Sequence, residues 1–165
     1  MAKVITFIVF ASMLAPVFSQ SLSVNAPGGD PDDSKRLAAE ATYELIVGYI
    51  AKEDYPKVQK EVRNLLDLQL PSKFDSQLGG AFRRITLKLL AIRQFAVAHT
   101  IVDMAIKELE GRDELQAELL LTKATIFKAE GKEDSAIEFF NKSRQITGQG
   151  GKHSKDAESK SGSKK

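Results

Sequence analysis

The stretch from Leu115 to Ile146 constrains the fold of this chain most, because apolar residues recur at helical spacing on both sides of a short polar turn. Residues three, four and seven positions apart share one face of a helix. The stretch therefore predicts two amphipathic helices, from about residue 114 to 130 and from about residue 133 to 146, with Gly131 in the turn. Weaker versions of this pattern occur twice earlier in the sequence.

Two further helix pairs are predicted upstream of this stretch. The first begins with a helix over residues 35–51, and its second helix ends before Pro71. The second pair spans Phe82–Leu109, and Gly111 marks its end. Helix-forming residues dominate the middle of the chain and strand-like alternation is scarce. The sequence thus predicts an all-α fold of about three antiparallel helix pairs over residues 35–147.

An internal repeat supports this division of the chain. Ala136 aligns with Ala98, 38 residues earlier, and Ala98 with Val58, a further 40 residues earlier, and an apolar residue follows each of the three four positions later. The pattern resembles the tetratricopeptide repeat family, whose unit is an antiparallel helix pair of about 34 residues. The residues that carry the resemblance are Ala98, Ala105, Ala124, Phe127, Gly131, Ala136 and Phe140. The chain departs from the family pattern at Thr86, where a Gly or Ala is preferred, and at Gly148, where a Pro is common.

The resemblance implies a right-handed stack of helix pairs in which Ala124 and Ala136 allow close packing and Phe127 and Phe140 fill the space toward neighbouring pairs. It also implies a concave groove, lined by the first helix of each pair, that holds a peptide or helix of a partner. The implied groove positions are Glu40, Tyr43, Val47, Ile50, Arg83, Leu87, Leu90, Glu118, Leu121, Thr125 and Lys128. The expected function is that of a non-catalytic scaffold or adaptor that binds another protein.

A different role follows from the last predicted helix. Ala136, Ile137, Phe139 and Phe140 cannot all face one neighbouring helix, and no polar capping helix follows Ile146. Exposed apolar surface at this end would favour self-association. The alternative hypothesis is therefore a structural or accessory subunit of an envelope or secretion assembly.

The sequence offers no constellation of residues for catalysis. The chain has no Cys and two His. His99 and Asp103 are four residues apart, but a metal site needs at least a third ligand. Asp30, Asp32 and Ser34 resemble the start of a calcium loop without its Gly and its final Glu, so a helix cap by Asp32, Asp33 or Ser34 is favoured. We expect no enzymatic activity, no metal and no cofactor.

The two ends of the chain differ in composition from the middle. Residues 1–19 combine a positive start at Lys3 with an apolar core and small residues, which predicts a signal peptide cleaved near Ser19–Gln20. The apolar run is short for a membrane anchor, the alternative. The protein is then exported, to a periplasm or the outside. Residues 20–34 are a predicted linker, and residues 148–165, rich in Lys, Ser and Gly, are a predicted disordered tail.

The charge distribution argues against nucleic acid as a partner. Residues 20–147 hold 18 basic and 20 acidic side chains, so the predicted helical domain carries a net charge of −2. The slight basic excess of the whole chain comes from Lys3 and from the tail. The tail could make weak contact with an anionic surface, or serve as a solubilising segment. The expected partner is another protein or a second copy of this chain.

Overall fold

The computed structural model describes the backbone of residues 30–158 and the side chains of residues 30–148. This part of the chain is built from helices alone. In chain order they are α1 (Pro31–Ala51), α2 (Tyr55–Asp67), the short 3₁₀ helix η1 (Ser72–Phe74), α3 (Asp75–Ala91), α4 (Phe95–Glu108), α5 (Asp113–Ala129) and α6 (Glu133–Glu158).

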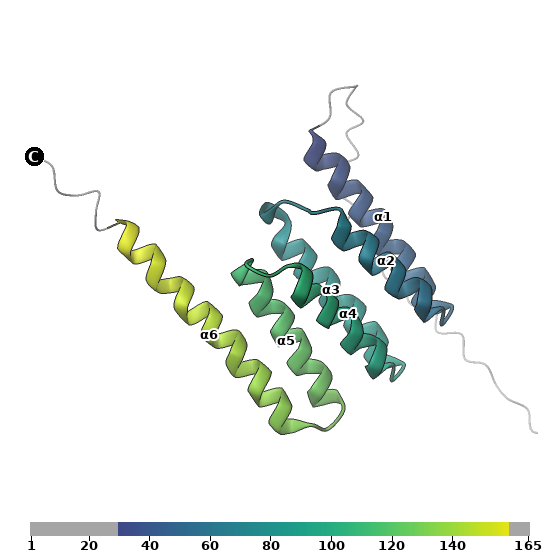
Figure 1. Ribbon diagram of the computed structural model, residues 1–165. Coiled ribbons are helices and arrows are strands. Elements are labelled where there is room, and N and C mark those ends of the chain that lie inside the picture. The colour runs from purple at the N-terminus through teal and green to yellow at the C-terminus, as the bar shows by residue number, and fades with distance from the viewer. Residues whose placement is uncertain (1–29, 159–165) are drawn as a thin grey trace, which may run out of the picture.

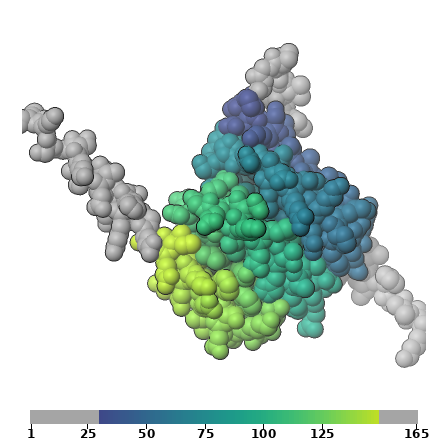
Figure 2. Space-filling model, in the orientation of Figure 1, coloured from purple at the N-terminus to yellow at the C-terminus, as the bar shows by residue number. Residues whose placement is uncertain are grey.

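Consecutive α-helices pack as antiparallel pairs, α1 with α2, α3 with α4 and α5 with α6. The first helices α1, α3 and α5 lie side by side, and α2 lies against α4 in a second row (Figure 1). The pair α1–α2 and the helix α6 occupy opposite ends of the molecule, as Figure 2 also shows. The predicted all-α fold of antiparallel helix pairs is confirmed.

One apolar core runs through α1 to α5. On α3, Phe82, Ile85 and Leu89 are fully buried, at the spacing that places them on a single helix face. Ile46 of α1 and Ile101 of α4 join the same cluster. Burial of a large aliphatic or aromatic side chain stabilises a fold by about 1.5–3 kcal/mol, so this shared cluster helps to hold the first five α-helices together.

The turns within the three pairs have the same backbone conformation. Their central residues Glu53, Arg93 and Gly131 have φ angles of 56°, 58° and 77°. In each turn the following N–H donates a hydrogen bond to the carbonyl five residues earlier, at 2.9–3.0 Å. The three bonds are Asp54 to Tyr49, Gln94 to Leu89 and Lys132 to Phe127. Positive φ is least costly for glycine, and the predicted place of Gly131 in its turn is confirmed.

Helix α1 begins earlier than the sequence predicts. Asp30 caps it, since its carboxylate accepts a hydrogen bond from the Asp32 N–H at 3.0 Å, whereas Asp32, Asp33 or Ser34 was the expected cap. Pro31 fits the first helical position because its φ angle is preset and its missing N–H would have no partner there. The residues up to 34 assigned to a linker therefore include the first turn of α1.

Helix α3 also begins earlier than expected, so Gly79 lies inside the helix rather than before it. A Cβ atom at Gly79 would collide with the carboxylate of Glu118 on α5. The absence of a side chain at Gly79 therefore leaves room for the Glu118 carboxylate against α3. Among the glycines of residues 30–148, Gly79 is the one whose replacement meets a neighbouring side chain so closely.

Helix α6 continues to Glu158, past its predicted end near Ile146 and into the predicted tail. Extending an existing helix requires no new nucleus, because each added residue brings its own hydrogen bond. The predicted signal peptide, the linker up to residue 29 and the tail after residue 158 lie outside the described residues. Among residues 30–158, no helix is both long and apolar enough to cross a bilayer.

Candidate functional site

The first helices α3 and α5 present a mixed apolar and basic face to solvent. Leu87 on α3 is 49% exposed and Leu121 on α5 is 40% exposed. Arg83 lies four residues before Leu87, and Thr125 lies four residues after Leu121, so each pair shares one side of its helix. Arg83, Thr125 and Lys128 are exposed as well. We call the surface formed by these five residues the α3–α5 face.

The remaining groove positions implied by the sequence are less accessible. Glu40, Tyr43, Val47, Leu90 and Glu118 are half-buried. Glu118 lies over Gly79 of α3 and so fills the seam between α3 and α5. None of these residues belongs to the exposed α3–α5 face.

Ile50 does not belong to a surface, which corrects its assignment to the groove. It is 5% exposed and belongs to the core. Ile50 follows the fully buried Ile46 by four residues, so both side chains point from α1 in the same direction. The groove positions that the repeat family implies for the first helix pair are therefore wrong at the last of them, Ile50.

A hollow of about 530 Å³ opens between α1 and α3. Its lining includes the buried residues Leu65, Leu70 and Leu78 and the half-buried residues Ala39, Tyr43 and Phe74. Leu37 of α1 and Ala81 of α3 also line it. Protein interiors are normally close-packed, and apolar hollows of 300–1,000 Å³ are typical of binding sites. We call this feature the α1–α3 hollow.

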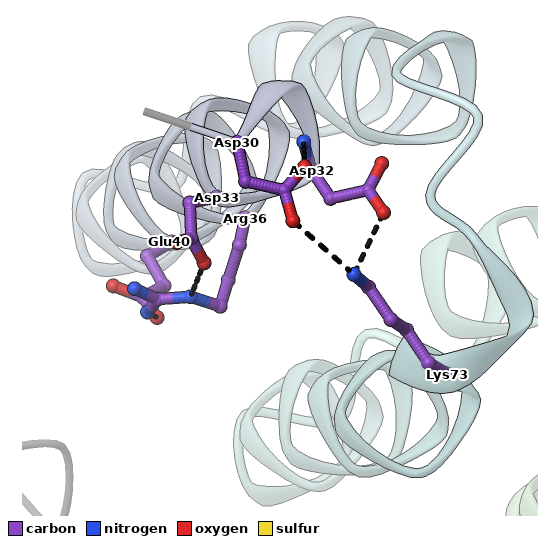
Figure 3. Close-up of polar contacts among 6 residues, drawn as sticks. All are labelled: Asp30, Asp32, Asp33, Arg36, Glu40 and Lys73. Carbon is purple, nitrogen blue, oxygen red and sulfur yellow. Dashed lines mark hydrogen bonds and ion pairs between the residues drawn. The ribbon is translucent and has the colours of Figure 1, made fainter. Parts of the chain in front are cut away.

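Charged groups of both signs stand at the edge of the hollow. Arg36 Nη1 lies 2.5 Å from Glu40 Oε1, and its Nε lies 3.7 Å from Asp33 Oδ1 (Figure 3). The Arg84 guanidinium stands 5.3 Å from the ring centroid of Tyr43, a cation–π distance. The apolar lining is thus bordered by charges of both signs, with no large excess of either.

The 3₁₀ helix η1 ties one end of the hollow to the start of α1. Lys73 Nζ lies 2.7 Å from Asp32 Oδ2 and 3.9 Å from Asp30 Oδ2 (Figure 3). The hydrogen bond to Asp32 raises the pKa of the Lys73 ammonium above its ordinary value. Phe74, the next residue, lines the hollow, so these ion pairs hold the segment that carries it.

The four alanines of the repeat signature occupy their expected buried positions. Ala98, Ala105, Ala124 and Ala136 are all in the interior. Phe140 does not fill space between helices, which corrects the prediction for this residue. Phe139 takes that place instead, and its ring stacks on Phe127 with centroids 5.3 Å apart. The buried side of α6 follows Ala136, Phe139 and Ser143, at spacings of three and seven residues that share one helix face.

The outer side of α6 carries exposed apolar residues, as the sequence analysis anticipated for this end. Ile137 is 57% exposed and Phe140 is 47% exposed. They are three residues apart and therefore neighbours on the helix surface. Arg144, also exposed, lies four residues after Phe140. This outer α6 surface is the second candidate site for a partner.

His99 of α4 contacts the C-terminal end of α5. Its Nε2 atom lies 3.1 Å from Glu130 Oε2, and its ring lies 4.6 Å from the ring of Phe127. Hydrogen bonding from His99, with a further contribution from Lys132, lowers the pKa of the Glu130 carboxyl group. Asp103, the partner of His99 considered from the sequence, pairs with Lys123 instead. The spacing of residues within α4 could not predict the contact between His99 and Glu130, because the two residues are 31 positions apart in the sequence.

The described part of the chain is thus an all-α protein of antiparallel helix pairs with an exposed face on its first helices, an apolar hollow and an exposed apolar end. Among the side chains of residues 30–148, no three His, Asp or Glu are placed to hold a metal ion. Comparison with protein-family models, with curated proteins and with solved structures finds no match.

Proposed function

We propose that this protein is a non-catalytic interaction module, of the tetratricopeptide-repeat type, that binds a peptide or helix of another protein on its α3–α5 face. The observation that carries the proposal is the exposure of Leu87 and Leu121 on adjacent first helices. Leucines on neighbouring parallel elements can bind the apolar side of an extended or helical segment. Arg83 beside Leu87 adds a residue type that is enriched at the centre of protein interfaces.

The repeated turn geometry supports the repeat assignment. The three residues aligned in the sequence analysis, Val58, Ala98 and Ala136, are all buried in the second helix of a pair. The N–H of each donates a 3.0 Å hydrogen bond to the residue four positions earlier, which directly follows the turn. The same local structure therefore stands at the same place in all three pairs, as expected for repeats of one unit.

A second candidate function is favoured by the outer α6 surface. Ile137 and Phe140 are large, exposed and close in position on α6, and contiguous exposed apolar surface marks interaction sites. On this proposal the protein is a structural or accessory subunit of an envelope or secretion assembly and associates with itself through α6. In both proposals the protein is exported, so the partner should be sought in the exported fraction of the source cells.

The two surfaces can be separated by matched double substitutions. Arg83→Glu with Leu87→Asp changes the α3–α5 face, and Ile137→Asp with Arg144→Glu makes the equivalent change on α6. All four residues are exposed, so both variants should keep the helix content of the parent. Loss of an interface leucine and reversal of its charged neighbour should weaken binding by about 2–4 kcal/mol, roughly 30- to 1,000-fold.

Affinity capture from the exported fraction, with quantitative mass spectrometry, measures the outcome. Loss of one specific partner in the Arg83/Leu87 variant alone supports the α3–α5 face. Loss of self-association in the Ile137/Arg144 variant alone, measured by sedimentation, supports the subunit proposal. If the Arg83/Leu87 variant retains every partner of the parent protein, the first proposal is wrong.

A further inference from the structure

The α1–α3 hollow is too large to be a simple packing defect. Its volume of about 530 Å³ exceeds the share of liquid volume of a single water, about 30 Å³, by more than tenfold. Buried leucines from α2, from the loop before η1 and from α3 contribute to its lining. Water against such a lining is unfavourable by about 25 cal/mol per Å² of apolar surface. The hollow therefore calls for an apolar occupant.

The balance of charge at the edge selects an uncharged occupant. Arg36 is engaged by Glu40 and Asp33, and Arg84 stands over the Tyr43 ring. A strongly charged segment would meet both signs and would gain little from either. An uncharged segment with apolar side chains leaves these contacts in place.

We propose that the occupant is the segment of this chain that precedes α1, residues 20–29, with Leu22 and Val24 inserted between α1 and α3. The segment QSLSVNAPGG carries no charged side chain, and Leu22 and Val24 are its only large apolar residues. They are two positions apart, so both point to the same side of an extended chain. Residues 20–29 follow the expected cleavage site, so they remain attached to α1 whether or not the leader is removed.

The length of the connection fits this assignment. Val24 is six residues from Asp30, a reach of about 20 Å for an extended chain. Ala39, in the wall of the hollow, is nine residues after Asp30, a rise of about 13 Å along α1. Pro27, Gly28 and Gly29 stand where the chain must reverse, and these residue types favour turns. The hollow and the start of α1 lie at the same end of the molecule, where Lys73 pairs with Asp30 and Asp32.

The absence of cysteine from the sequence allows a direct test by an engineered disulfide. Val24→Cys is combined with Ala39→Cys in one variant and with Ala38→Cys in a second. Both alanines are half-buried neighbours on α1, but Ala39 lines the hollow and Ala38 does not. A disulfide requires Cα atoms about 4.4–6.8 Å apart. Equilibration of the purified proteins in a glutathione buffer measures the effective concentration of each thiol pair.

The effective concentration of the thiol pair in the Val24→Cys, Ala39→Cys variant should exceed that of the Ala38→Cys control at least tenfold. Adding Leu22→Asp should remove most of this difference, because a carboxylate does not enter an apolar hollow. If Ala39→Cys disturbs the fold, as judged by circular dichroism, Ala81→Cys on the opposite wall replaces it. Equal values for the two pairs would overturn the proposal. Disulfide-linked dimers formed through Ala39→Cys would also overturn it and would point to a second copy as the occupant.

Discussion

At the scale of single residues, the contact between His99 and Glu130 makes stability depend on pH. The pKa of Glu130 lies below its ordinary value of 4.5, first because His99 hydrogen-bonds to the carboxylate. A carboxyl group whose pKa is lower in the folded state stabilises the fold above its unfolded pKa. This contribution is lost as the pH falls through the folded-state pKa, below about 4.5.

Substitution of Glu130 isolates this contribution. Glu130→Gln should lower the free energy of unfolding by about 1 kcal/mol at pH 7, the typical net value of one hydrogen bond. The difference between parent and variant should shrink as the pH drops below the range in which Glu130 is ionised. Urea denaturation at several pH values measures it. Glu110→Gln is the control, because Glu110 is exposed and lies outside the contact between His99 and Glu130. A difference that stays constant down to about pH 3, where carboxyl groups are mostly protonated, would contradict this account.

At the scale of elements, two of the turns between paired helices place a residue with a side chain in the left-handed backbone conformation, which glycine adopts at lower free energy. Glu53 has φ 56°, a left-handed conformation that costs a residue with a side chain roughly 1–2 kcal/mol. Glycine adopts it readily but loses more backbone entropy on folding, by about 0.5–1 kcal/mol. Glu53→Gly should therefore stabilise the protein by about 0.5–1 kcal/mol, and Gly131→Ala should destabilise it by about 1 kcal/mol.

Chemical denaturation of both variants measures these changes. Lys52→Gly is the matched control, because Lys52 is the neighbouring exposed residue with an ordinary φ of −93°. It should destabilise the protein, since glycine there gains no conformation that lysine lacks. Stabilisation by both Glu53→Gly and Lys52→Gly would show that relief of the left-handed conformation is not the cause.

The sequence predicted the helices well because their period is local. Ala98 and Ala136 stood out from the internal spacing, Ala124 from the resemblance to the repeat family, and all three are buried. Contacts between helices were harder to predict from the sequence, because a periodic pattern defines the buried face of a helix but not the residues that lie opposite it. Glu118 over Gly79 and His99 beside Glu130 depend on the register of neighbouring helices. The α1–α3 hollow depends on how far two helices separate, which no residue pattern in the chain encodes.

At the scale of the whole molecule, the apolar core ends at α5, whereas the stack of helices continues to α6. The apolar core cluster draws its fully buried residues from α1 to α5 and the loops that join them, whereas α6 packs on α5 alone. Its outer side is exposed at Ile137 and Phe140. An element with a packing partner on one side only should open locally at a lower free energy than elements in the middle of the stack.

Hydrogen exchange followed by mass spectrometry can test this order. Amides of α6 in residues 133–148 should exchange faster than amides of α3 and α4, which have neighbours on both sides. Ile137→Asp should leave this order unchanged in the monomer, because Ile137 is exposed and lies outside the core cluster. If α6 is as well protected as α4 in the parent protein and loses protection on dilution, its outer side is covered by a second copy. Protection that persists at high dilution would instead mean that α5 alone holds α6 as firmly as the core holds α4.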